Sequence, residues 1–312
     1  MRVVVSVLLA CACTGVHAQQ LGQYTQYVFN QFSVNPAVAG SKDCIDLRIG
    51  YRQQWLGFKG APTTGWASLH GTLRPKGKPY INNKHGLGAF VEADQAGHWG
   101  YTRMVLAYAY HLRMTQDTYF SMGFFAGAQQ MKFNVGDVIV TDFNDPVIDG
   151  RASVLVAPDV TPGLFVYGKK GWGGVALHQA LGNRINDIGV ESRLARQFMM
   201  SGGYRWVMGR KSVFSPSALF KLGQGVPMAA DLNAMVEWNR AIALGVGYRN
   251  GDAMVFMMKL AFLKYFQLGY SYDVTTSTLR AAGSNTHEIV LGITPCGRED
   301  IHKKMINCPA FD

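Results

Sequence analysis

Large apolar side chains recur at every second position in segments of about ten residues along most of the chain. Between Arg240 and Arg249, one face carries Ile242, Leu244, Val246 and Tyr248, and the other is mainly alanine and glycine. The same alternation runs through residues 103–113, 120–127, 254–262 and 266–273. Successive side chains of a β-strand point to opposite faces, and a tilted strand of about ten residues crosses a bilayer. The chain is therefore predicted to be all-β and to cross a membrane with its strands.

The face opposite the large apolar residues is mostly glycine, alanine and serine, with scattered charges. In a soluble β-sandwich, that face would be solvated and rich in lysine, glutamate and threonine. Charged residues make up 16% of the chain, against about 25% in soluble domains. The composition favours a membrane barrel with a narrow or filled interior over a soluble secreted β-sandwich that acts as a binding module.

Tight connections separate the alternating segments, at Asn250-Gly251, Trp238-Asn239-Arg240 and Leu263-Lys264. Asn-Gly favours a type I′ turn, in which both central residues have positive φ. Met228 to Asp273 is thus predicted to form four strands of a meander. Over residues 45–295 we predict a transmembrane antiparallel up-and-down β-barrel of about 14 strands, beginning near residues 45, 63, 85, 100, 117, 160, 171, 195, 212, 228, 240, 252, 264 and 285.

The predicted barrel has an orientation and a girdle. An even number of strands places both termini on the periplasmic side. The longest irregular stretch, Phe133 to Asp159, is then an extracellular loop. Aromatic residues fall near strand ends, as in the girdles of outer-membrane barrels; they are Trp99, Trp206, Trp238, Tyr248 and Tyr272.

Residues 1–18 have the features of a signal peptide. Arg2 precedes an apolar stretch, and Val16-His17-Ala18 fits the small-x-small cleavage rule, with cleavage before Gln19. A lipoprotein signal is the alternative, because Leu8-Leu9-Ala10-Cys11 resembles a lipobox. Export places the chain in an oxidising compartment, outside the reach of nucleic acid. The formal charge of +10 then indicates anionic lipid headgroups, an anionic passenger in the lumen or a periplasmic partner.

Three cysteines follow the signal peptide. Cys44 lies just before the first predicted strand and Cys296 just after the last, and these strands pair when a barrel closes. A Cys44–Cys296 disulfide would therefore join the two sides of the seam. The alternative is Cys296 with Cys308 in a periplasmic C-terminal tail, residues 296–312. Either pairing leaves one thiol over.

The sequence contains few features of a catalytic site. The protein is therefore predicted not to be an enzyme and to need no cofactor or metal. The histidines are scattered and no Cys-x-x-Cys occurs. Gly171-Trp172-Gly173-Gly174 is more simply a turn that enters a strand than a phosphate loop. Asp142, Asp145 and Asp149 lack the spacing of an EF-hand and are more simply a solvated loop.

Residues 19–44 do not resemble a membrane strand. Tyr24 to Asn30 and the segment Ser33 to Ser41 suit a short helix or an extended arm. We expect an N-terminal periplasmic strap at the mouth of the barrel or a plug in its lumen, because a long N-terminal segment stays ordered only when it is tied down.

Two motifs resemble the PorP/SprF family of outer-membrane proteins of the Bacteroidota type IX secretion system. The first runs from Asn35-Pro36-Ala37 through Ala39-Gly40-Ser41, and the second from Arg52 to Thr64. The terminal Cys308-Pro309-Ala310-Phe311 resembles the family's C-terminal ending, whereas Val38 departs from an aromatic position. The candidate residues for partner contact or scaffolding are Asn35, Pro36, Gly40, Trp55, Gly57, Phe58, Gly60, Pro62 and Thr64.

The resemblance implies a barrel that works with the secretion and gliding machinery. It implies that the partner is a secretion subunit or the C-terminal domain of a secreted adhesin. The barrel pattern alone is equally compatible with a small-solute transport barrel, porin-like or FadL-like. On physical grounds, Trp55, Phe58 and Pro62 would fix a rigid turn at the end of the first hairpin.

Overall fold

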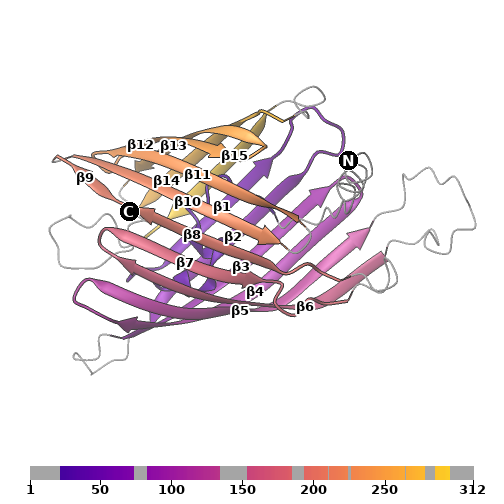
Figure 1. Ribbon diagram of the computed structural model, residues 1–312, viewed down its shortest axis with the longest axis horizontal. Coiled ribbons are helices and arrows are strands. Elements are labelled where there is room, and N and C mark those ends of the chain that lie inside the picture. The colour runs from indigo at the N-terminus through magenta and orange to yellow at the C-terminus, as the bar shows by residue number, and fades with distance from the viewer. Residues whose placement is uncertain are drawn as a thin grey trace, which may run out of the picture.

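The computed structural model describes residues 22–73, 83–133, 153–184, 193–209, 211–223, 226–263, 265–277 and 285–295, and it forms a closed β-barrel (Figure 1). Its strands are β1 (Asp46–Gln53), β2 (Thr63–Leu73), β3 (Lys84–Ala96), β4 (Trp99–Arg113), β5 (Thr118–Phe133), β6 (Ser153–Gly168), β7 (Gly171–His178), β8 (Gln197–Tyr204), β9 (Trp206–Met208), β10 (Ser212–Gly223), β11 (Val226–Trp238), β12 (Ile242–Arg249), β13 (Ala253–Phe262), β14 (Phe266–Thr275) and β15 (Thr286–Ile293).

Each strand pairs antiparallel with its neighbour, and β1 closes the ring against β15, with Leu47 opposite Ile293. β8 and β9 both pair with β10, so β9 continues β8 beyond Arg205 and the ring has fourteen strands. The predicted strand number is confirmed. Thirteen of the fourteen predicted starts lie within two residues of the observed ones.

The exception is β6, which begins at Ser153 rather than near residue 160, so the predicted loop from Phe133 to Asp159 is too long. Two prolines made this strand look like a loop in the sequence. Pro158 and Pro162 lie in a stretch of β6 that pairs with β5 but not with β7, whose pairing starts at Gly163. Proline is tolerated where one strand edge needs no backbone donor.

The tight turns also differ in detail from the prediction. Asn239 and Arg240 have φ of 50° and 54°, which is the pattern of a type I′ turn. At Asn250-Gly251 only Gly251 has positive φ, at 70°, and the Asp252 amide donates to the Arg249 carbonyl. A type I′ turn was therefore predicted at the wrong one of the two connections.

Alternation sorts the side chains between lipid and lumen. On β12, Ile242, Leu244, Val246 and Tyr248 are 48%, 60%, 55% and 50% exposed, whereas Ala243 is buried. We call the end where β1 begins and β15 ends the proximal end, and the opposite end the distal end. Exposed aromatic residues lie near both, Trp206 and Trp238 proximally and Trp99 and Tyr248 distally; Tyr272, toward the distal end, is half-buried.

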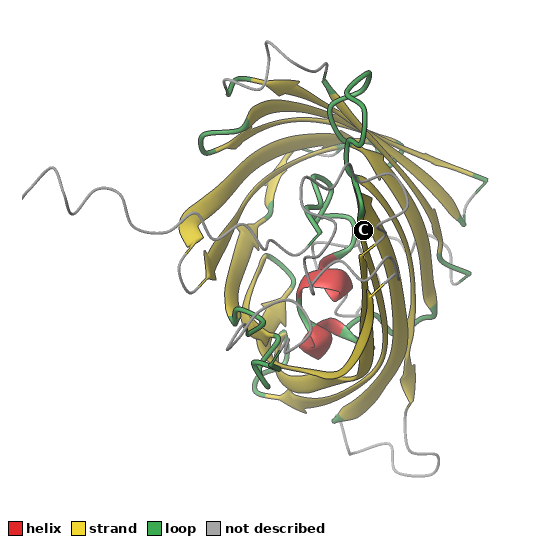
Figure 2. Cartoon of the chain, turned by 90° about the vertical axis from the view of Figure 1, so that its right-hand side faces the viewer, coloured by secondary structure: helices red, strands yellow, loops and turns green. Residues whose placement is uncertain are grey.

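The N-terminal segment lies inside the barrel (Figure 2). It contains the short helix α2 (Gln31–Val34) and the 3-10 helix η1 (Pro36–Val38), both fully buried. No helix in the described part of the chain has the length and apolar character needed to cross a membrane. The core of the molecule is therefore the contact between this segment and the inner face of the strands.

Candidate functional site in the lumen and at the distal rim

Residues 22–44, which we call the plug, run along the lumen from the distal to the proximal end. Near the distal end, the side-chain Nε2 of Gln54 donates to Oε1 of Gln23 (3.4 Å). Near the proximal end, the Lys84 ammonium donates to the Ser41 carbonyl (2.7 Å). The sequence was compatible with a strap at the mouth of the barrel or a plug in its lumen, and in the structure the segment lies in the lumen as a plug. The described chain thus begins at one end of the barrel and finishes at the other, and the predicted placement of both termini on one side concerns residues outside the described ranges.

The distal half of the plug rests on a buried ionic network of the barrel wall. Arg52 lies 3.0 Å from Asp273 and 3.2 Å from Glu288, and all three side chains are almost fully buried. Glu288 also accepts the backbone amides of Thr25 (2.7 Å) and Gln26 (3.1 Å). A buried charge is tolerated only when it is paired and hydrogen-bonded. The plug supplies part of that requirement, which ties it to the wall.

The network extends around the wall to Arg249. Its guanidinium contacts Asp273 (3.3 Å) and Asp231 (2.6 Å), and it donates to the Thr25 hydroxyl (3.1 Å). The Thr25 hydroxyl in turn donates to Asp273 (2.7 Å). Strands from opposite parts of the sequence therefore meet at one plug residue.

Three wall histidines hold the proximal half of the plug by its backbone. His111 Nε2 donates to the Ala39 carbonyl (2.7 Å) while its Nδ1 accepts from the Tyr167 hydroxyl (3.0 Å). His178 Nε2 donates to the Val34 carbonyl (2.7 Å). On β2, His70 Nδ1 accepts the Gly40 amide (3.3 Å). These histidines are scattered in the sequence, but they have a common role in holding the plug.

Wall glycines leave room for the plug. A Cβ on Gly123 would lie 2.8 Å from Ala37 Cα, and one on Gly88 would lie 2.6 Å from the Phe32 ring. A Cβ on Gly86 or Gly163 would overlap plug atoms of Ala39 or Asn35. The inner face is therefore shaped to the plug at the level of single methyl groups.

The first family motif lies in the plug. The Asn35 side chain donates to the carbonyls of Leu164 (2.9 Å) and Val175 (3.2 Å), and accepts the Ala37 amide (2.9 Å). Pro36 is the first residue of η1, where a missing amide costs nothing. Gly40 has φ of 72° and approaches Gly86 too closely for a side chain. These three motif residues lie within the lumen, where they contact the wall or shape the plug.

The second motif forms the connection between β1 and β2, residues 54–62, which we call the motif loop. Three of its residues have positive φ: Trp55 (42°), Gly57 (89°) and Gly60 (77°). The Gln54 amide donates to the Pro62 carbonyl (2.9 Å) and closes the loop. Beside it, Thr64 at the start of β2 donates its hydroxyl to Asp94. The predicted turn at the end of the first hairpin is confirmed.

Hydrogen bonds fix the motif loop to the connections on both of its sides. The Leu56 amide donates to the Asn285 carbonyl (3.2 Å), and the Gly97 amide donates to the Gly60 carbonyl (2.9 Å). The loop nevertheless exposes Leu56 at 42% and Phe58 at 46%. It is thus a braced loop that presents apolar side chains at the distal rim.

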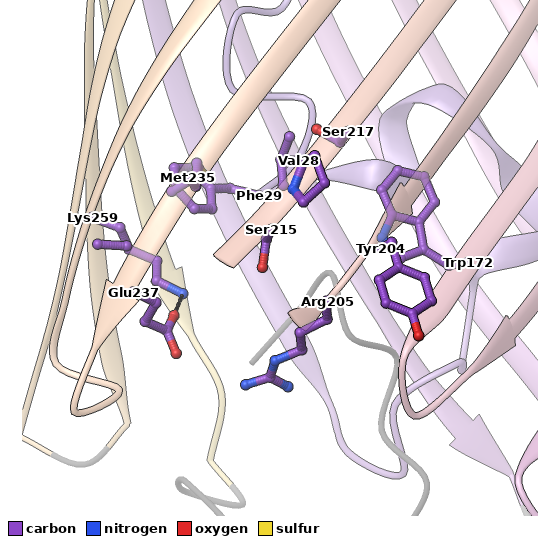
Figure 3. Close-up of a pocket in the computed structure, with 12 residues that line it drawn as sticks. Val28, Phe29, Trp172, Tyr204, Arg205, Ser215, Ser217, Met235, Glu237 and Lys259 are labelled. Carbon is purple, nitrogen blue, oxygen red and sulfur yellow. Dashed lines mark ion pairs between the residues drawn. The ribbon is translucent and has the colours of Figure 1, made fainter. Parts of the chain in front are cut away.

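One cavity beside the plug, within the described part of the barrel, is small. Figure 3 shows the residues that line it, among them Val28 and Phe29 of the plug and the wall pair Lys259 and Glu237. Its volume is about 40 Å³, and the Lys259 ammonium lies 2.7 Å from the Glu237 carboxylate. One water needs at least about 10–15 Å³ on this measure. The cavity therefore holds a few waters and no solute of metabolite size.

The remaining predicted sites are the cysteines, the aspartate-rich loop and the glycine-rich segment. Cys44 is disulfide-bonded, and the possible partners Cys296 and Cys308 lie outside the described residues, as do Asp142, Asp145 and Asp149. Within the described ranges, no three His, Cys, Asp or Glu side chains are grouped to hold a metal. The Gly171–Gly174 segment begins β7.

Solved structures with a similar fold are outer-membrane barrels. The Ralstonia pickettii toluene transporter TbuX superposes with a TM-score of 0.51 at 11% identity, over 87% of this chain and 94% of its own. A Pseudomonas aeruginosa FadL homologue gives a TM-score of 0.48 at 10% identity, over 88% and 94%. Identities this low show the fold alone.

No curated protein matches the sequence. The profile of one family does, described as "Type IX secretion system membrane protein PorP/SprF", and it aligns with residues 16–293. That range includes the plug, the motif loop and all the strands, so the chain belongs to the PorP/SprF family of type IX secretion system membrane proteins.

Proposed function

We propose that this outer-membrane barrel is a non-enzymatic component of the type IX secretion and gliding machinery that binds another protein through its rim. The partner is a secretion subunit or the C-terminal domain of a secreted adhesin. The observation that carries the proposal is the plug, which is hydrogen-bonded to buried wall residues near both ends of the lumen and fits closely against wall glycines. A barrel filled in this way acts through its outer surfaces.

The motif loop is the contact surface that we assign. Exposure of apolar side chains to water at the rim is unfavourable in free energy unless a partner covers them. Leu56 and Phe58 are exposed although their backbone is braced on both sides. A preorganised loop binds with little loss of conformational entropy.

The contact is tested by substituting Leu56→Ser and Phe58→Ser together. The double variant should keep its heat-modifiable gel mobility, because neither side chain is part of the core, and should lose the proteins that co-purify in mild detergent. Met114→Ser is the matched control, since Met114 is also an exposed apolar residue of a turn, at the proximal end. Undiminished co-purification with the double variant would rule out the motif loop.

In cells, deletion of the gene should abolish surface display of particular secreted substrates, and the wild-type gene should restore it. Unchanged display of every substrate would argue against a role in secretion.

A small-solute transport function is the competing hypothesis, and the likeness to a toluene transporter raises it. The two functions differ in conductance. Reconstituted into liposomes, the protein should show no steady open pore, because the plug fills the lumen. A stable single-channel conductance in the wild-type protein would favour transport.

We further propose that the proximal end faces the periplasm. The even strand number and the position of β15 at this end support it. The motif loop and the start of the plug would then lie at the cell surface.

A further inference from the structure

The turns at the proximal end are basic. Arg113 ends β4, Lys169 and Lys170 connect β6 to β7, Arg205 and Lys211 flank β9, and Arg240 connects β11 to β12. In the described part of these turns the acidic residue is Asp117, which lies 2.6 Å from Lys169. These turns follow one another around the ring from β4 to β12. The cations thus form an arc along the rim rather than one patch.

In the sequence, the segments that join the strands at the two ends differ in charge. The connections between strands at the proximal end contain ten Lys or Arg and one acidic residue. The connections at the distal end contain six Lys or Arg and seven acidic residues. The formal charge of +10 is therefore nearly all accounted for by the proximal connections.

Exposed aromatic rings lie between the cations. Tyr204, Trp206, Trp238 and Tyr265 are all exposed near the proximal strand ends. Trp206 packs against Tyr204 (centroids 4.8 Å apart) and stacks on Phe214 (5.8 Å). Tryptophan and tyrosine at strand ends mark the depth of the lipid headgroups. Cations at the same depth meet headgroup phosphates.

We propose that the proximal rim binds the phosphate groups of anionic phospholipids in the leaflet that surrounds it. Lipids lie along the whole rim of a barrel, and the cations follow this rim from β4 to β12. Lys169, Lys170 and Lys211 are all exposed on successive turns, where an ammonium is a compact point charge for phosphate. The proposal concerns the opposite end from the motif loop and does not depend on the protein partner.

The test is lipid retention. Wild-type protein is reconstituted in nanodiscs of phosphatidylcholine with a minor share of phosphatidylglycerol, extracted in mild detergent, and its bound lipids are measured. The wild type should be enriched in phosphatidylglycerol. One basic residue near an anionic surface contributes a factor of about five, so the triple variant Lys169→Gln, Lys170→Gln and Lys211→Gln should lose at least about fivefold of that enrichment.

Two matched variants separate charge from structure. Lys169→Arg, Lys170→Arg and Lys211→Arg together should retain the enrichment. So should a distal triple variant, Lys132→Gln, Arg184→Gln and Arg196→Gln, which removes the same charge from exposed residues of the other end. Heat-modifiable mobility confirms that each variant is folded.

Equal enrichment in the wild type and the proximal triple variant overturns the proposal, and so does an equal loss in the distal one. In a second set of nanodiscs that also contains lipopolysaccharide, its enrichment in place of phosphatidylglycerol overturns the phospholipid source and reverses the proposed orientation. Loss of a co-purifying acidic protein, with unchanged lipid enrichment, assigns the rim to a protein instead. Each result is independent of the Leu56 and Phe58 experiment.

Discussion

At the scale of single residues, both missing side chains and charged side chains of the inner wall hold the plug in place. Gly123 lets the plug backbone approach the wall closely, and Arg52 donates to the Thr25 hydroxyl of the plug. Both positions point inward by strand parity, which the sequence shows. That Arg52 meets Asp273 and Glu288, more than 200 residues away, depends on the closure of the ring and is not encoded in local spacing.

Gly123→Ala should destabilise the barrel by about 1–3 kcal/mol, because the new methyl group must displace the plug backbone at Ala37. Gly173→Ala is the matched control, since its Cβ would meet its nearest atom at 3.6 Å. Urea unfolding in detergent measures both. Equal midpoints for the two variants would contradict the close fit of the plug.

Arg52→Met should cost about 3–5 kcal/mol, because it leaves Glu288 and Asp273 buried without their cation. Lys169→Met breaks an ion pair that is half-exposed on both sides and should cost at most about 1 kcal/mol. The same unfolding assay compares them. A small loss for Arg52→Met would show that the buried network contributes little to stability.

At the scale of elements, strands were predictable and the plug was only partly so. Lipid and lumen impose opposite chemistry on alternate residues, so a strand such as β12 is readable from its sequence alone. The plug lacks a period because every side of it is buried. Its glycine and histidine contacts are visible only once β2, β4 and β7 surround it. The start of β6 was missed because its prolines are permitted by a missing neighbour, which is a property of the sheet.

The seam between β1 and β15 is the element for which we predict a disulfide. The register pairs Leu47 with Ile293, and three further steps beyond both strands would bring Cys44 opposite Cys296. Peptide mapping without reductant should find these two linked, and Cys44→Ser should lower stability by about 2–4 kcal/mol, whereas Cys308→Ser should not. A Cys296–Cys308 peptide would contradict the seam disulfide.

At the scale of the whole molecule, the path of the plug determines where the N-terminus emerges. Gly22 lies toward the distal end, next to Glu92 and Thr64. If cleavage occurs before Gln19, only three residues precede it, and they span at most about 10 Å. They cannot return through the lumen. The N-terminus should therefore lie on the opposite side of the membrane from the end of β15.

An epitope inserted after Gln19 should bind antibody on intact cells, and one appended after Asp312 should bind only after the outer membrane is permeabilised. A cell-surface signal from both tags, or from neither, would contradict the traversing plug. A signal from the C-terminal tag alone would keep the plug and invert the barrel.

The traversing plug also constrains the order of assembly. The segment that fills the ring is joined directly to β1, and its bonds to Glu288 connect residues 262 and 263 positions apart. Loop-closure entropy delays such contacts until almost all of the chain has been made. Until then β1 and β15 are unpaired edge strands, and Arg52 is not yet paired with Asp273 and Glu288. Pairing of β1 with β15 and enclosure of the plug must therefore be a single late event. A chaperone that stayed bound to the N-terminal segment would keep the barrel open.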